Sequence, residues 1–211
     1  MKKGLFIIAI VAVLVGGYFA IFSKKNDDKE QTNNQPEKQP RLAISKNPSQ
    51  FNDAFAAVMN SYYTVKDALV NWDSAKAKEE AKTLSGLISM VPLNVLQADS
   101  NIILTAKNFA GAAATESDKL AAATTITSQR REFSTLTDNL YSLINTVRYD
   151  KEVMYYDKCP MAFNESEEGY WLSRDSAIVN PYLGNKHPKY KGSMVTCGDV
   201  EQTVDYANAK K

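Results

Sequence analysis

Apolar residues recur at spacings of three and four along the middle of the chain, which is the pattern of amphipathic helices. Because the connections between these stretches are short, they predict a mainly α fold, an antiparallel four-helix bundle over residues 47–149. The stretch TESDKLAAATTIT, between the third and fourth helices, is expected to hold short helical turns at most. The four expected helices cover about residues 47–72, 73–92, 96–114 and 127–148.

Individual residues mark where these helices should begin and end. Asn47 is expected to cap the first helix with Pro48 at its first position, and Asp73 to cap the second helix, which Pro92 ends. The core is expected to consist of the residues on the apolar faces: Phe51, Phe55, Val58, Met59, Tyr62, Val65, Leu69, Ala77, Ala81, Leu84, Leu87, Ile88, Val91, Ile102, Ile103, Ala106, Phe109, Ala110, Ala113, Phe133, Leu136, Leu140, Leu143, Ile144 and Val147.

After the fourth helix the pattern changes to short β-prone and turn-rich segments. VMYYDKCPMAF and GYWLS favour strands, and the turn-dense NPYLGNKHPKYKGS precedes MVTCGDV. We therefore expect a small irregular β appendage over residues 150–204, followed by a tail at 205–211. A region of about 50 residues buries little apolar area alone, so it should pack on the bundle, be held by a disulfide or bind a metal.

The N-terminal end has a different composition. Residues 4–22 carry no charge and, as a helix, would span roughly 28 Å, close to the thickness of a bilayer. This length favours a transmembrane anchor at residues 1–23 over a cleaved signal peptide, whose apolar core is usually shorter. Lys2 and Lys3 are balanced by Lys24 and Lys25, so the charges leave the orientation open. The usual topology of such anchors, in the inner membrane with the remaining chain in the periplasm, is the expected one. Residues 24–46 are polar and lack a periodic apolar face, which predicts a flexible linker.

The overall composition limits the functions that are compatible with the chain. Its 211 residues are 44% hydrophobic and 23% charged, as in globular proteins, and the net charge of +1 gives no attraction to nucleic acid. With one histidine and no Gly-rich phosphate loop, no motif for catalysis is present, and we expect no enzyme.

The order of four short motifs in the C-terminal region carries a resemblance to a known family. They are Cys159-Pro160-Met161, Gly169-Tyr170-Trp171-Leu172-Ser173, Asn180-Pro181-Tyr182 with Gly184, and Met194-Val195-Thr196-Cys197-Gly198. Together with the helical pattern, over about residues 51–204, they resemble a helical domain of unknown function. That domain occurs alone or fused to the periplasmic adaptor subunits (membrane fusion proteins) of copper and silver efflux systems of the resistance-nodulation-division type. The resemblance implies a domain that handles copper or silver beside heavy-metal efflux components.

The chemistry of the sulfur-containing residues agrees with that implication. Cu(I) and Ag(I) are soft ions that prefer thiolate and thioether ligands. Cys159 and Met161 should share one face of an extended segment, and Met194 and Cys197 lie three apart, within reach around a turn. If the two segments are neighbours, four sulfur atoms converge on one site.

Two other arrangements of the same residues remain open. Cys159 and Cys197 could instead form a disulfide, which would stabilise the region by about 3 to 4 kcal/mol, with the methionines as apolar filler. A thiol pair that binds metal only when reduced would combine both possibilities. His187 is expected to be either an exposed loop residue or an accessory metal ligand.

Overall fold

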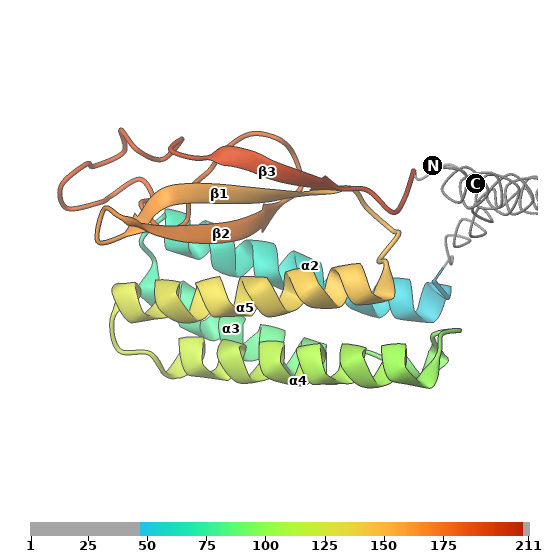
Figure 1. Ribbon diagram of the computed structural model, residues 1–211. Coiled ribbons are helices and arrows are strands. Elements are labelled where there is room, and N and C mark those ends of the chain that lie inside the picture. The colour runs from blue at the N-terminus through green and yellow to red at the C-terminus, as the bar shows by residue number, and fades with distance from the viewer. Residues whose placement is uncertain (1–46, 209–211) are drawn as a thin grey trace, which may run out of the picture. The chain divides into compact units, whose positions relative to one another are not determined.

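The helices predicted by the apolar pattern are present in the computed structural model, which describes residues 47–208. Consecutive helices lie side by side and run antiparallel, as Figure 1 shows. Asp73 caps α3 as expected, because its side chain accepts a hydrogen bond from the backbone N–H of Lys76 at 2.9 Å. The bounds are α2 (Ser49–Val70), α3 (Ser74–Ser89), α4 (Ser100–Ala122) and α5 (Ile126–Val147), with a 3-10 turn η1 (Leu93–Val95) before α4.

A three-stranded antiparallel sheet follows the helices, in the order β2-β1-β3. β1 is the central strand, and its pairing with β3 joins segments far apart in the sequence. Its partners shift register twice, between Tyr156 and Asp157 on the β3 side and between Cys159 and Phe163 on the β2 side. The strands are β1 (Met154–Phe163), β2 (Glu167–Ser173) and β3 (Asp199–Val204).

The sheet covers one face of the helical part. In Figure 1 it lies over α2 and α5, while α3 and α4 form the layer on the other side of these two helices. Tyr62 of α2 joins the layers, since its hydroxyl is 2.8 Å from Thr137 Oγ1 of α5 and accepts a hydrogen bond from the N–H of Leu172 in β2 at 3.0 Å. The small β region is therefore stabilised by packing on the bundle.

One continuous apolar core runs through the helices and the sheet. Phe133 of α5 stacks on Tyr62, with ring centroids 5.1 Å apart, and Phe55 of α2 contacts Tyr149, with centroids 4.7 Å apart. Trp171 of β2 and Tyr182 of the following loop are buried in the same core. Burial of such large aromatic side chains on both elements opposes separation of the sheet from the bundle.

The prediction for the segment after the third helix was wrong. α4 continues to Ala122, through most of the stretch expected to hold only short turns. The stretch contains no Gly or Pro to end the helix, and Ser117 and Leu120 continue the buried positions after Ala113. Ser117 is accommodated because its hydroxyl donates to the carbonyl of Ala113 at 3.0 Å.

Two further expectations for single residues were wrong. Ile102, expected in the core, is 41% exposed, because the inward face of α4 begins only at Ala106. Asn47 does not cap α2; its side-chain amide donates to the carbonyls of Val147 and Arg148 at 3.1 and 3.0 Å. These carbonyls at the end of α5 have no helical partner, so they are satisfied by Asn47 instead.

The anchor expected at residues 1–23, the linker at 24–46 and the end of the tail lie outside the described residues. Within residues 47–208, none of the helices combines the length and the apolar character that crossing a membrane requires.

Candidate metal-binding site

The fold brings Cys159 and Cys197 together. Cys159 lies in the central strand β1, opposite Gly169 of β2, and is buried. Cys197 lies just before β3 and is half-buried. Their Sγ atoms are 3.7 Å apart, although the residues are separated by 38 positions in the sequence.

Asn180 holds the segment that carries Cys197. It is fully buried, and its side-chain amide donates to the carbonyl of Cys197 at 2.7 Å, while its backbone N–H donates to the carbonyl of Val195 at 2.8 Å. Its side-chain oxygen accepts hydrogen bonds from the N–H groups of Tyr182 and Leu183 at 2.8 and 3.0 Å. One side chain therefore fixes both the turn around Asn180 and the backbone beside the second cysteine.

Gly198 allows the close approach of this segment to β1. Its φ is +138°, and a Cβ atom at this position would be 2.5 Å from the carbonyl oxygen of Lys158 and 2.9 Å from the ring of Trp171. Residues with a side chain rarely adopt this φ, and a Cβ atom would also clash, so both the backbone conformation and the lack of space require glycine. The glycine thus lets Cys197 lie beside Cys159.

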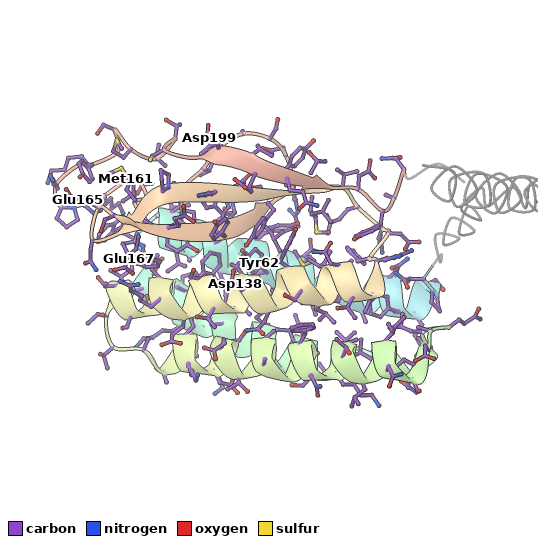
Figure 2. All side chains as sticks on the ribbon, in the orientation of Figure 1. Tyr62, Asp138, Met161, Glu165, Glu167 and Asp199 are labelled. Atoms are coloured by element: carbon purple, nitrogen blue, oxygen red, sulfur yellow. The ribbon has the colours of Figure 1, made fainter. Side chains whose placement is uncertain are left out.

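Met161 and Met194 are near the cysteines in sequence. Both are half-buried and pack against the core, and Figure 2 shows Met161 at the same end of the sheet as Glu165 and Glu167. The register shift in β1 begins after Cys159, so simple alternation does not extend from Cys159 to Met161. Whether the two thioethers complete a site with the thiols stays a prediction.

His187 lies in the loop between β2 and β3, where it faces a different group of residues. Its Nδ1 atom accepts backbone hydrogen bonds from Lys189 and Tyr190, both at 3.2 Å, so only Nε2 is free for a ligand. The ring stacks on Tyr190 and contacts the edge of Trp72, with centroids 4.9 and 5.8 Å apart. The pocket that His187 lines includes neither cysteine.

The electrostatic environment keeps the second thiol protonated at neutral pH. Burial, with the neighbouring Cys159 as the next cause, raises the pKa of Cys197 to about 11. A nucleophilic cysteine needs a lowered pKa, so this environment does not activate Cys197 as a nucleophile. A metal ion that binds here must displace its proton.

The separation of the sulfur atoms limits the chemistry of the pair. Two metal–thiolate bonds of about 2.3 Å that span 3.7 Å enclose an angle of about 107° at the metal. A linear arrangement would need the sulfur atoms about 4.6 Å apart, so the present separation favours a bent arrangement with room for a further ligand. A disulfide would require the sulfur atoms to approach to about 2.05 Å. Across residues 47–208, no three His, Cys, Asp or Glu side chains form a metal-binding group, so the further ligand must be of another type, such as a thioether.

Sequence reasoning missed the buried polar residues near these strands. Asp157 of β1 and Arg130 of α5 are 0% and 4% exposed. The sequence around each residue is also compatible with an exposed position, because Asp157 is followed by Lys158 and Arg130 by Arg131. Asp157 is buried within the sheet, and Arg130 is buried against the loop around Pro181, the end of α2 and Trp72.

The fold and the cysteine pair define a mainly helical domain covered by a small sheet, with one thiol in the central strand and an adjacent thiol just before β3. A family model described as a protein of unknown function (DUF3347) matches residues 58–152, from within α2 to the segment before β1. The match supports a helical domain of unknown function and ends before both cysteines. No curated protein and no solved structure gives a significant match to the chain.

Proposed function

We propose that this chain is a membrane-anchored periplasmic domain that binds Cu(I) or Ag(I) and serves heavy-metal efflux or resistance. The observation that carries the proposal is the 3.7 Å separation of the Cys159 and Cys197 sulfur atoms. The resemblance of the C-terminal motifs supports the link to efflux, and the uncharged stretch at residues 4–22 supports the anchor.

In this proposal the two thiolates supply two ligands, and Met161 or Met194 supplies the third. Soft ligands favour Cu(I) and Ag(I) over Zn²⁺, which prefers thiolate together with imidazole. A bent bis-thiolate arrangement leaves room on one side of the metal for a thioether, and both methionines are half-buried beside the same core.

A structural disulfide is the second candidate, and the same sulfur pair supports it. A bond between Cys159 and Cys197 would close a loop that includes β2 and the turn-rich segment. In the chain-entropy model, closure of a loop of this length contributes about 3 to 4 kcal/mol. The chain would then be a non-catalytic interaction or structural module.

Thiol counting followed by metal titration separates the two candidates. The full chain is purified from the periplasmic side of the membrane, its free thiols are counted, and it is titrated with Cu(I) against a competing chelator before and after mild reduction. The metal-binding proposal predicts one Cu(I) per reduced chain. No uptake after reduction, with a Cys159 to Cys197 linkage in the isolated protein, would support the structural module instead.

Variants test the individual ligands. Cys159→Ser and Cys197→Ser should each abolish high-affinity binding, and Met161→Leu or Met194→Leu should weaken it at least about tenfold, or about 1.4 kcal/mol. Met90→Leu is the matched control, because Met90 is 70% exposed at the end of α3. Unchanged affinity in both single methionine variants would eliminate the thioether ligands; unchanged affinity in the cysteine variants would eliminate the site.

A further inference from the structure

The pocket that His187 lines lies where the first turns of α5 meet the end of β1. Its volume is about 240 Å³, below the range of about 300 to 1,000 Å³ usual for drug-sized ligands. Trp72, Phe163 and Tyr182 give it aromatic walls, and Arg130 and His187 provide polar groups. A pocket of this size and lining suits a small polar molecule.

Arg130 is the central group of this pocket. Its side chain is 4% exposed, and its guanidinium lies 4.1 Å from the ring centroid of Trp72. Nε donates to the carbonyl of Pro181 at 2.8 Å, and Nη2 donates to the carbonyl of Leu69 at 2.9 Å. A guanidinium has five N–H donors, so these two bonds leave others free.

Arg130 is one of the residues that line the pocket. Several fully buried side-chain atoms in the described part of the chain lack a hydrogen-bond partner, and none of them belongs to Arg130. Nη1 of Arg130 makes no hydrogen bond among residues 47–208 and is not one of these buried atoms, so it retains accessible surface, and Arg130 lines the pocket.

The charge of Arg130 is not neutralised by a carboxylate. None of the ion pairs among residues 47–208 includes it. Burial lowers the pKa of Arg130 to about 10, with no acidic neighbour to offset the effect. The carbonyl of Leu69 belongs to the last turn of α2, whose dipole offsets only about half a unit charge. The site thus retains positive charge.

Two further features favour an anion here. Thr127 lines the pocket from the first turn of α5, a 22-residue helix with no acidic residue in that turn, so the positive end of the helix dipole adds to Arg130. His187 has its Nδ1 occupied by backbone N–H groups, which places the proton of the neutral ring on Nε2 as a donor. The guanidinium of Arg131 donates to both carboxylate oxygens of Glu167, at 2.5 and 3.2 Å, so Arg131 is not a free donor for the pocket.

We propose that this pocket binds a small oxyanion, a phosphate or a carboxylate, through Arg130, His187 and the N-terminal end of α5. The planar guanidinium matches either group with two parallel N–H bonds. The inference rests on residues other than the sulfur ligands, so it stands or falls separately from metal binding.

Calorimetric titration of the full chain with inorganic phosphate tests the proposal, with acetate as the carboxylate arm and chloride at equal ionic strength as the reference. We expect saturable binding of phosphate or acetate and none of chloride. Arg130→Gln should weaken binding at least about tenfold. Lys82→Gln, which removes the same charge from an exposed position on α3, should leave it unchanged.

Arg130 also satisfies the end of α2, so its variant could fail to fold. A double variant, Thr127→Val with His187→Leu, keeps Arg130 and its bonds to Pro181 and Leu69; it alters the pocket wall and the two loop hydrogen bonds that His187 Nδ1 accepts. It should fold and bind the anion at least about threefold less tightly. Wild-type affinity in the double variant, or equal heats for chloride and phosphate with the wild-type chain, would overturn the proposal.

Discussion

Replacement of Asp157 by asparagine should remove a pH dependence from the stability of this domain. Asp157 lies in β1, is 0% exposed, and accepts a hydrogen bond from the Ser173 hydroxyl at Oδ2. Its other oxygen is buried without a partner among residues 47–208. A carboxylate in such a site is poorly solvated, so its protonated form is favoured.

The size of this pH dependence follows from the shift in the pKa of the Asp157 carboxyl group. Burial is the largest cause; the Ser173 hydrogen bond and Lys66 oppose it, and Asp175 adds to it, so that the pKa of Asp157 is raised from 3.8 to about 6. Between about pH 4 and pH 6 the folded state holds the proton that the unfolded state releases. Stability therefore falls as the pH rises through this window, and the full penalty above pH 6 is about 3 kcal/mol.

The assay is urea unfolding of the full chain, followed by tryptophan fluorescence at a series of pH values from 4 to 7. Asparagine cannot ionise, so the difference in unfolding free energy between Asp157→Asn and wild type should shift by about 2 kcal/mol in favour of the variant between pH 4 and pH 7. Any constant offset from the new amide group cancels in this comparison. Asp118→Asn, at an exposed position of α4, is the control and should run parallel to wild type. Parallel profiles for Asp157→Asn and wild type would refute the reasoning.

Two other substitutions test how the sheet is held on the bundle. Tyr62→Phe removes the buried hydroxyl and leaves the N–H of Leu172 without its partner, so we expect a loss of about 1 to 3 kcal/mol in urea unfolding, whereas a loss below 0.5 kcal/mol would contradict a structural role. Gly198→Ala meets both a positive φ and a close backbone contact and should lower stability by about 1 to 3 kcal/mol or more. The paired variant Gly111→Ala, in open space on α4, should instead raise stability by about 0.5 to 1 kcal/mol, and equal thermal shifts for the two glycines would show that the close approach is unimportant.

The helices could be predicted because their apolar spacing is a local property of the sequence. The end of α4 was predicted too early because its last residues are mostly small or polar and add few strongly apolar positions. Ser117 alone suggests a turn, whereas in the structure its hydroxyl donates to the carbonyl of Ala113 within the helix. Asn47 was misplaced for a related reason, since asparagine satisfies free carbonyls at a helix end as well as free N–H groups at a helix start.

The candidate sites depend on pairings that the sequence does not contain. The spacing of Cys159 and Cys197 permits many separations, and only the pairing of β3 with β1 sets their sulfur atoms 3.7 Å apart. The sequence shows the charge of Arg130 but not its burial, which depends on the loop around Pro181, whose carbonyl accepts a hydrogen bond from Arg130. In both cases the residue type was visible, while the burial that gives it a specific chemistry comes from the tertiary packing.

The proposed metal site lies at the start of β3, the strand with the fewest buried residues. Only Val204 of β3 is buried, so β3 lies on the sheet with little apolar area to hold it. Its far end is joined to α5 through the Tyr141 hydroxyl, which donates to the side chain of Gln202 at 2.6 Å. At its near end Cys197 is the side chain that reaches the central strand. A metal ion or a disulfide at Cys159 and Cys197 would add a link at the start of β3, which is otherwise held by backbone hydrogen bonds and by the bond from Asn180 to the carbonyl of Cys197. Occupancy of the site would thus order the start of an edge strand.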